Sequence, residues 1–557
     1  MRKALIVAAA VAAAVFFFLV AMLPPAPASA VGTIDSDLQR RTVPGAFHVH
    51  STRSDGAATK QEIAAAASRA GLRFIVFSEH GDGTRALDPP EYVNGVLCID
   101  AVEISTNGGH YVAVGIPQAP YRLGGEPSAV VEDVRRLGGF GVAAHPDSQK
   151  AALAWTDWSV PIDGIEWLSA DSEWRDESRV RLARALLQYP FRPAAVIASI
   201  FDRPTSTLAR WDALASQRRV VGLAGHDAHG GIGRGDENGG YGITGVPSYE
   251  AAFRSFALRL ITSRELSADP PADASLLLDA LRSGRVFTAI DALALPAFLD
   301  FRARQGSVST MMGEQLPSLG RTTYSVRATV PPRGRLVLLR NGGEVASVDE
   351  PELSFESDEA GAYRVEIRVP SAPGAPAVPW LVSNPIYALA PAAVVAAARE
   401  TPLEVLSLSA SPWRVEKDPR SEAVIAPVDG GLRLRFRLEA GAPASQFVAA
   451  VTALPAPLPD YDAILFEAQS DRPARMFVQL RFDGDSGERL GKSVYVSPQV
   501  QRIVVRAADL VSVDRSSQSH PDSHNASSLL VVVDLTNAVP GASGEIVVRR
   551  PSLAQLR

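Results

Sequence analysis

Residues 45–56 read GAFHVHSTRSDG, and the spacing of the polar residues in this stretch decides how the chain is interpreted. His48 and His50 stand two positions apart in a short run typical of a β-strand, so their side chains project from the same face. Asp55 follows where a loop is expected. Imidazole nitrogen and carboxylate oxygen are both good ligands for a divalent cation. The stretch therefore predicts a strand whose carboxyl end carries part of a metal site.

The segments beyond this strand alternate between helical and strand patterns up to about residue 300. Thr59 and Glu62 form a capping-box signature that opens a helix, and Gly71 stands where a helix C-cap is expected. Apolar runs that predict strands follow at 73–80, 95–105, 110–117, 141–147, 162–169, 194–201 and 220–230. Helical patterns occupy 127–138, 178–189, 249–262 and 273–284. This alternation predicts a parallel α/β sheet or barrel over residues 40–300.

Histidines are concentrated in this region. Seven of the 9 histidines fall between residues 48 and 229: His48, His50, His80, His110, His145, His226 and His229. Most stand at or just after the end of a predicted strand, the edge where α/β folds assemble their sites. Asp227 and His229 repeat the spacing of His48 and His50, whereas strand alternation points His226 to the opposite face. With Asp55 and Glu103, these residues predict a site for divalent ions such as Zn, Mn or Fe.

The rest of the chain has an all-β character. Residues 301–390 alternate apolar and polar residues between Gly and Pro, which predicts a small β-sandwich. An Ala/Pro-rich stretch at 391–402 is interpreted as a linker. Residues 403–557 predict a second β-sandwich or jelly roll, whose last strands loosely resemble carbohydrate-binding modules. Trp413 is the only tryptophan there, so an aromatic platform for sugars is not evident.

The N-terminus predicts export. Residues 1–30 contain two basic residues, an apolar run at 4–23 and an Ala28-Ser29-Ala30 cleavage pattern, which indicates a signal peptide or an uncleaved membrane anchor. The protein is therefore expected in the periplasm or outside the cell. A formal net charge of -6 offers no basic field for nucleic acid. Cys98 is the single cysteine, so no intrachain disulfide can form.

The order of the motifs resembles that of the polymerase and histidinol phosphatase (PHP) metallohydrolases. The motifs are HVHSTRSDG, SEHGD, EIS, HYVAVG, AHPD and GHDAH, and they span residues 44–230. The resemblance implies a distorted (β/α)7 TIM-like barrel that holds up to three metal ions. It assigns His48, His50, Glu103 and Asp227 to one ion, with Glu103 bridging to a second. His110 and His145 complete the second ion, and the third belongs to Asp55, His80 and His229. The exported branch, including CehA/McbA-like enzymes, is the more similar one.

The resemblance implies hydrolysis by metal-activated water, with Asp227, Glu103 and His80 as catalytic residues. Arg53, Arg175 and Arg234 lie near the motifs and are candidates to bind a substrate phosphate. The proton donor to the leaving group is open among three candidates: Asp82, Glu79 and His226. Glu166, Asp171 and Trp174 are further candidates to line the pocket.

Three functions remain open from the sequence. The leading hypothesis is a phosphoesterase that acts on a small-molecule phosphoester. The alternative enzyme is a carboxylic ester, carbamate or amide hydrolase that uses the same site. An arginine-rich pocket would favour phosphate, whereas an apolar pocket with Trp167 or Trp174 would favour a neutral ester. The third hypothesis is an envelope- or carbohydrate-binding protein with a metal-stabilised barrel.

Overall fold

The computed structural model describes residues 6, 16, 20–232, 243–390, 402–442, 445–483, 488–513 and 521–557. The chain forms two compact units. Unit 1 comprises residues 1–81, 87–116 and 134–393, and unit 2 comprises residues 82–86, 117–133 and 394–557. Most of the predicted signal or anchor segment, the predicted linker and Arg234 lie outside the described residues. Within those residues, no helix is long and apolar enough to cross a bilayer.

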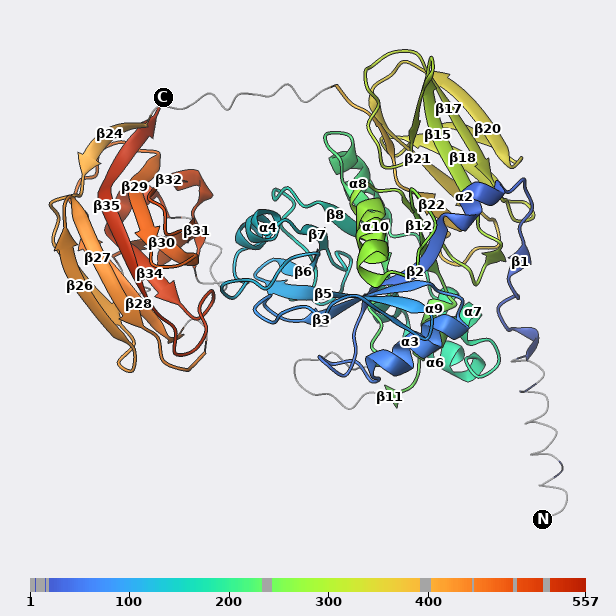
Figure 1. Ribbon diagram of the computed structural model, residues 1–557, viewed down its shortest axis with the longest axis horizontal. Helices are drawn as coiled ribbons and strands as arrows, with labels where there is room; N and C mark the ends of the chain where they lie inside the picture. Colours follow the sequence, from blue (N-terminus) through green and yellow to red (C-terminus); the bar gives the residue numbers. More distant parts are fainter. Residues whose placement is uncertain are drawn as a thin grey trace. The chain divides into compact units, whose positions relative to one another are not determined.

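A mixed sheet of 15 strands forms the centre of unit 1 (Figure 1). In spatial order its path is β19 (Gly343–Val348), β18 (Arg335–Arg340), β21 (Gly361–Arg368), β22 (Leu381–Ser383), β13 (Val286–Ala289), β12 (Ala257–Ile261), β2 (Thr42–Val49), β3 (Phe74–His80), β5 (Val96–Thr106), β6 (Gly109–Val114), β7 (Phe140–Ala143), β8 (Gly164–Ser169) and β9 (Val221–Gly225). Two short strands pair off this path: β4 (Glu91–Val93) with β5, and β23 (Ile386–Ala388) with β21.

The two ends of the strand series β2 to β9 are hydrogen-bonded to each other. The His226 amide donates to Phe47 O at 2.9 Å, and the His50 amide donates to Ala228 O at 3.1 Å. Val49 and Ala228 also form an isolated parallel bridge. These bonds bring the residues after β2 and after β9 together at one edge of the sheet.

The expectation of an all-parallel sheet is wrong at β6. Strands β2, β3 and β5 run parallel, and so do β7, β8 and β9, but β6 pairs antiparallel with both β5 and β7. The cause is local, since Thr106 pairs with Gly109 and only Asn107 and Gly108 connect the two strands. An Asn-Gly pair between two strands is a strong hairpin signal, and a two-residue connection allows only antiparallel pairing.

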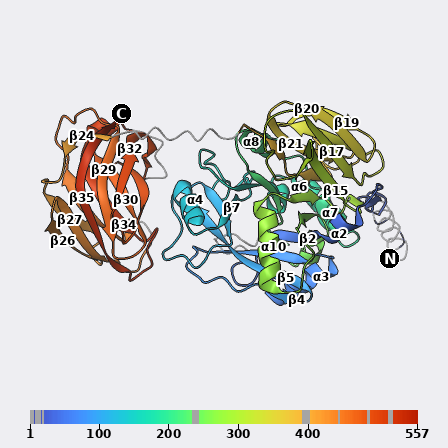
Figure 2. The same cartoon turned by 45° about the horizontal axis from the view of Figure 1, so that its top comes forward.

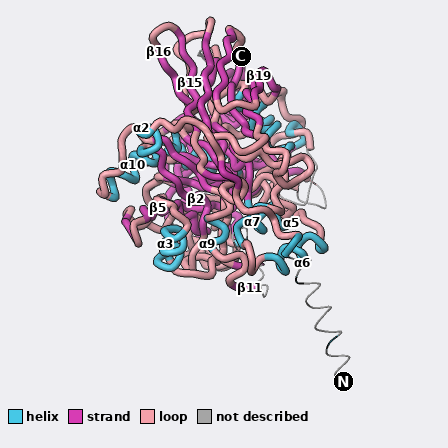
Figure 3. Tube along the Cα trace, turned by 90° about the vertical axis from the view of Figure 1, so that its right-hand side faces the viewer, coloured by secondary structure: helices cyan, strands magenta, loops and turns pink. Residues whose placement is uncertain are grey.

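Helices surround the strands of the α/β region (Figure 3). Those assigned to unit 1 in the described residues are α2 (Ser36–Arg40), α3 (Lys60–Arg69), α5 (Ala170–Arg175), α6 (Arg179–Gln188), α7 (Pro193–Ala198), α8 (Thr205–Ala215), α9 (Tyr249–Phe253) and α10 (Pro270–Arg282). Helix α4 (Pro127–Arg136) begins in the part of the chain that belongs to unit 2. Two predicted elements differ from these. The run at 194–201, expected as a strand, contains helix α7, which Pro193 opens at its first turn. The helix expected at 249–262 ends at Phe253, because the buried residues of β12 pair with β2.

The strands after residue 298 continue the central sheet and add a second one. β15 (Leu299–Gln305), β16 (Val308–Met311), β17 (Thr322–Ala328) and β20 (Glu352–Ser357) form a separate sheet of four strands. The strands β18, β19, β21 and β22 instead extend the large sheet, because β22 pairs with β13. Short pairs join β1 (Ala28–Ser29) to β14 (Ala294–Leu295) and β10 (Gly231–Ile232) to β11 (Ile243–Thr244).

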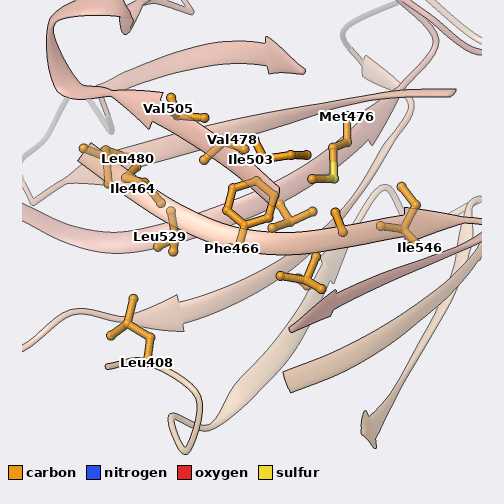
Figure 4. Close-up of a cluster of buried hydrophobic side chains, with 14 of the residues drawn as sticks. Leu408, Ile464, Phe466, Met476, Val478, Leu480, Ile503, Val505, Leu529 and Ile546 are labelled. Atoms are coloured by element: carbon orange, nitrogen blue, oxygen red, sulfur yellow. The ribbon is translucent and has the colours of Figure 1, made fainter. Parts of the chain in front are cut away.

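Two sheets of six strands each make up most of unit 2 (Figure 2). One contains β24 (Pro402–Ser407), β26 (Glu422–Val428), β27 (Gly431–Arg437), β29 (Ala463–Ser470), β32 (Gln501–Arg506) and β35 (Ser543–Leu556). The other contains β25 (Trp413–Lys417), β28 (Phe447–Ala453), β30 (Ala474–Phe482), β31 (Arg489–Val496), β33 (Val511–Ser512) and β34 (Ala526–Asp534). Their apolar residues, among them Phe466, Met476 and Leu529, form one buried cluster (Figure 4).

Segment 117–133 belongs to unit 2, although it is distant in sequence from the strands that it contacts. The buried guanidinium of Arg475 in β30 donates to both carboxylate oxygens of Asp133, at 2.8 and 2.7 Å. Lys492 pairs with Glu126 at 3.0 Å, and the Asn537 amide donates to the carbonyl of Gly124. Polar side chains therefore fix this segment to the β-sandwich within unit 2.

Candidate metal centre

The predicted ligands come from the ends of six strands of unit 1. His48 lies near the end of β2 and His50 directly follows this strand, His80 is the last residue of β3, and Glu103 lies in β5. The others come from β6 and from the residues that follow β7 and β9: His110, His145, Asp227 and His229. Asp55 lies in the loop between β2 and α3. Because these strand ends share one edge of the sheet, residues up to 181 positions apart converge there.

Three of these residues have a left-handed backbone. The φ angle is 65° at His48, 29° at His145 and 45° at Asp227, a region that non-glycine residues occupy rarely. Such conformations cost of order 1–3 kcal/mol each and persist where the surrounding structure holds them. At these three positions the turn away from the strand carries the side chain into the cluster.

Glu103 is the common partner of five histidines: His48, His50, His80, His110 and His145. Its Oε1 lies 2.8 Å from His110 Nδ1 and 2.9 Å from His145 Nε2. Its Oε2 lies 3.2 Å from His48 Nε2 and 3.3 Å from His50 Nε2. Asp227 Oδ1 approaches the same two Nε2 atoms, at 3.3 and 3.2 Å. The two carboxylates therefore share His48 and His50 as partners.

Asp55 lies close to a second set of imidazoles, those of His50, His80 and His229. Its oxygens lie 3.3 Å from His80 Nε2, 3.3 Å from His229 Nε2 and 3.6 Å from His50 Nδ1. His80 Nδ1 also lies 3.2 Å from Glu103 Oε2, which connects this set to the first. The side chains of His80 and Asp55 are 33% and 27% exposed, whereas Glu103 is 1% exposed, so solvent reaches the centre from the Asp55 side.

All nine predicted ligands fall into four overlapping groups whose ligand atoms lie within 4.8 Å of one another. The groups are His50, Asp55, His80 and His229; His48, His50 and Asp227; His48, Glu103 and His145; and His80, Glu103 and His110. The structure thus brings together the three residues expected around a third ion and adds His50 to them. It divides the expected second set, because His110 and His145 meet Glu103 in different groups.

The donor atoms of the cluster fit divalent cations. Within the described chain, five buried atoms of these residues have no hydrogen-bond partner: His48 Nε2, His50 Nε2, Glu103 Oε2, His145 Nδ1 and His229 Nε2. Leaving a buried polar atom unsatisfied costs about 1–3 kcal/mol. Each of these atoms has a lone pair for coordination once any proton on it has left, so a bound cation would satisfy groups that the protein itself leaves unpaired.

The electrostatics indicate the same need for positive charge. Burial disfavours the ionised carboxylates of Glu103 and Asp227, but nearby imidazoles, His48 first, hold both pKa values well below their usual range. Burial also opposes protonation of His80 and His229, yet neighbouring carboxylates raise the pKa of each to about 9. Protonated imidazoles thus balance the carboxylates, a role that divalent cations can take over with release of protons.

The carboxylate of Glu166 orients two of the predicted ligands through hydrogen bonds. Its Oε1 lies 2.7 Å from His48 Nδ1, and its Oε2 accepts the His145 amide at 2.7 Å. Gly225 makes room for this carboxylate, since a Cβ there would lie 2.1 Å from Glu166 Oε1. The sequence predicts Glu166 as a pocket-lining residue, whereas the structure places its carboxylate against His48. A glutamate in an apolar strand beside the motifs was the available signal.

The candidate phosphate-binding arginines are engaged elsewhere. Arg53 pairs with Asp88 and Asp100, and Arg175 pairs with Asp171 at 2.5 Å. Arg234 lies outside the described residues. The structure therefore brings neither of the two described arginines to the ligand cluster as a free donor.

The three candidate proton donors also have partners. Glu79 accepts hydrogen bonds from Ser51 and Ser54, and Asp82 accepts from Thr84 and Arg122 within unit 2. The His226 ring stacks on Phe256, with centroids 4.0 Å apart, and burial lowers its pKa to about 4. Each of the three side chains is thus hydrogen-bonded or packed within its own unit.

An apolar cavity of about 220 Å³ adjoins the cluster. Asp227 and His229 form part of its wall, together with Asp171, Trp174 and Tyr189. Trp174 lies in the wall of this cavity, as expected, and its indole nitrogen donates to Asp171 at 2.8 Å. Trp167 is buried elsewhere, with its indole nitrogen 3.4 Å from Thr288 Oγ1.

Comparisons with known proteins give only distant likenesses. No family model matches the chain, and no curated protein matches its sequence. A two-domain protein from Bacteroides vulgatus, described as containing a predicted PHP-like metal-dependent phosphoesterase, is 13% identical with a TM-score of 0.31. That alignment covers 65% of this chain and 99% of the other. A family 11 carbohydrate-binding module of a Clostridium thermocellum cellulase is 13% identical with a TM-score of 0.23, over 28% of this chain and 95% of the module. Assignment of function therefore depends on the site itself.

Proposed function

We propose that this protein is a metal-dependent hydrolase of the PHP type, and that its most favoured reaction is hydrolysis of a phosphoester. The observation that carries the proposal is the convergence of nine predicted ligands around Glu103, with five of their buried polar atoms lacking a partner among the described residues. A structural ion needs about four ligands. A larger, partly solvent-exposed set suits several ions that act on a substrate.

Up to three divalent ions, Zn, Mn or Fe, fit the imidazole and carboxylate donors. His48, His50, Glu103 and Asp227 would hold one, His110 and His145 would share Glu103 with another, and Asp55, His80 and His229 would hold the third. Bound ions in such sites supply an activated water at neutral pH and polarise the oxygen of the scissile group.

The protein's own residues prepare the site for this chemistry. The carboxylate of Glu166 accepts the Nδ1 hydrogen of His48, which leaves the lone pair of Nε2 facing Glu103 and Asp227. Similarly, His229 Nδ1 lies 2.9 Å from the carbonyl of Asp227, which leaves Nε2 for the Asp55 side. Burial of Glu103 excludes bulk water, and the exposed edge of His80 admits the substrate.

The second candidate function is hydrolysis of a carboxylic ester, carbamate or amide. One observation favours it, because the cavity beside Asp227 is apolar, contains Trp174, and has no lysine or arginine among the described residues that line it. An uncharged ester group needs no arginine, whereas a phosphate usually has one. The experiment below separates the two classes.

The test uses the full chain loaded with Mn or Zn, and it measures p-nitrophenyl phosphate, bis-p-nitrophenyl phosphate and p-nitrophenyl acetate as substrates. Asp227→Asn keeps the shape of the side chain and removes its charge, and Asp349→Asn, at an exposed position, is the matched control. We expect phosphate turnover to fall by more than about 100-fold in Asp227→Asn, the upper end of what loss of an outer-shell partner alone causes.

The outcomes separate the hypotheses. Turnover of acetate alone, sensitive to Asp227→Asn, would replace the phosphoesterase by an ester hydrolase. A protein that binds the metals and turns over none of the substrates would support the binding-protein hypothesis. Export and carbohydrate contact by unit 2 stay proposals that rest on the sequence patterns. Fractionation of the host cells and a glycan-binding assay test them.

A further inference from the structure

The cavity beside the metal cluster has mostly apolar walls. Helices α5, α6, α7 and α9 (Figure 3) supply most of its walls through side chains such as Trp174, Leu182, Ile197 and Ala252. One part of its wall is formed by Asp227 and His229, two predicted metal ligands. A group that fills the cavity therefore lies directly beside the position of the scissile bond.

Two polar groups of the cavity wall, the carboxylate of Asp171 and the hydroxyl of Tyr189, already have hydrogen-bond partners in the protein. Asp171 accepts from Trp174 and Arg175, and the hydroxyl of Tyr189 accepts the Ser248 amide at 2.8 Å. The remaining walls are mostly aliphatic and aromatic carbon. At about 220 Å³ the cavity is smaller than the roughly 300–1,000 Å³ typical of drug-sized ligands, so it suits a short alkyl chain or a single ring.

We propose that the substrate is an amphiphilic ester: its ester group lies at the metal cluster, and an apolar chain attached to it occupies this cavity. The inference rests on the proposed function and deepens it by naming the substrate class. In the reaction the ester P–O or C–O bond breaks, water supplies the oxygen of the new acid, and a proton goes to the leaving alcohol. The cavity binds the chain and takes no part in these bond changes.

Helix α6 connects the cavity to the apolar N-terminal run. Leu182 and Leu186 of this helix line the cavity, while Arg184 and Gln188 donate to the carbonyl of Met22 at 3.1 and 2.7 Å. Met22 stands at the end of the apolar run 4–23. The same helix exposes Val180 and Leu187, which are 82% and 59% accessible. An amphiphile can therefore arrive from water or from a bilayer surface, and the test includes both sources.

The first measurement is the chain-length dependence of kcat/KM for the metal-loaded full chain. Two series are used below their micelle concentrations: ethyl, butyl, hexyl and octyl phosphates, and the matching p-nitrophenyl alkanoates. Each methylene that leaves water for the cavity is expected to raise kcat/KM about fourfold until the cavity is full. A series that is turned over with no dependence on chain length would overturn the inference and leave the hydrolase intact. No turnover of any member would overturn the proposed function as well.

The second measurement fills the cavity. Ile197→Trp places a larger side chain in its wall, and Leu187→Trp, at an exposed position of α6 outside the lining, is the matched control. We expect the octyl-to-ethyl ratio of kcat/KM to fall at least about tenfold in Ile197→Trp and to stay within about twofold in Leu187→Trp. If Ile197→Trp does not fold, Leu186→Ser provides a second variant, because Leu186 lines the cavity and is 42% exposed. Equal ratios in all folded variants would contradict the proposal.

The third measurement separates the two sources. Octyl phosphate is presented as free monomer, and a long-chain alkyl phosphate is presented in phosphatidylcholine vesicles, both to the full chain. Faster turnover of the vesicle-borne ester would assign the bilayer as source, and faster turnover of the monomer would assign solution. Either result agrees with an amphiphilic substrate, and turnover of neither, with ethyl phosphate still hydrolysed, would overturn it.

Discussion

At the scale of single residues, the site depends on side chains behind the ligands as much as on the ligands. Glu166 is buried, contacts His48 and accepts the His145 amide, so it fixes two predicted ligands from two strands. Carboxylates that hold a ligating histidine in this manner raise its basicity and fix its orientation. The predicted ligand set is thus complete only with this glutamate.

We expect Glu166→Gln to lower metal affinity about 10- to 100-fold, because the neutral amide holds His48 less well and no longer raises its basicity. Isothermal titration of the metal-free protein with Zn measures the change. Glu350→Gln, at an exposed turn, is the control. Unchanged affinity in Glu166→Gln would show that the His48 contact has no part in metal binding.

A second buried glutamate makes stability depend on pH. Burial raises the pKa of Glu173 to about 9, from a usual value of 4.5, and nearby Asp202 contributes to the rise. Because the folded-state pKa lies above that of the unfolded chain, stability is lost as pH rises through this window. Glu173→Gln should therefore raise the Tm at about pH 8 and leave it unchanged at about pH 4.

The Tm of both forms, followed by calorimetry across that range, tests this expectation. The Gln side chain can still accept the Asp202 amide, which donates to Glu173 Oε2 at 2.8 Å in the native protein. Glu265→Gln, with an exposed side chain, should leave the pH profile as it is. A stabilising effect equal at both pH values would mean that charge is not the cause.

At the scale of elements, the sequence predicts where ligands stand but not the direction of every strand. The spacing of His48 and His50 and the motifs after each apolar run predict ligands at strand ends. Most of the candidates do lie at or just after such an end, whereas Glu103 lies inside β5 and His110 near the start of β6. The reversal at β6 was missed because an Asn-Gly turn is a two-residue signal inside a long apolar pattern. The strand β12 was missed because a five-residue apolar run is compatible with either a helix or a strand.

The N-terminal segment is a further element with a testable role. Ala30 donates to the carbonyl of Leu295 at 2.8 Å, β1 pairs with β14, and Arg192 donates to the carbonyl of Pro24 at 2.6 Å. Each such bond contributes about 0.5–1.5 kcal/mol. A chain that begins at Val31 should therefore have a lower Tm than one that begins at Met22. Differential scanning calorimetry of the two chains measures the change, and equal Tm values would contradict a stabilising role for residues 22–30.

At the scale of the whole molecule, the sequence patterns do not predict the boundaries between the two units. The region 301–390 is expected as a separate sandwich, but only part of it forms a separate sheet: β18, β19, β21 and β22 share the large sheet of the α/β region, because β22 pairs with β13. Likewise, segment 117–133 belongs to unit 2 through Arg475, which lies more than 340 residues away in sequence. Ion pairs over such separations leave no local signal that a single sequence can reveal.

Arg475→Met should destabilise unit 2 by about 3–5 kcal/mol, because it leaves the buried carboxylate of Asp133 without its cation. Tyr121 also donates to Asp133, so the loss extends into the 117–133 segment. Limited proteolysis and denaturant unfolding measure the effect. Arg472→Met, which removes an exposed guanidinium paired with Asp471, should change the unfolding free energy by less than about 1 kcal/mol.

The hairpin of β5 and β6 has a consequence for the order in which the site assembles. Glu103 and His110 are 7 residues apart, whereas Glu103 and His145 are 42 apart and His48 and Glu166 are 118 apart. Loop closure is entropically cheapest for the shortest separation, so the Glu103–His110 contact can form first during synthesis. A nascent chain would then present a metal-binding pair long before Asp227 leaves the ribosome, and the later ligands would close around an ion already held.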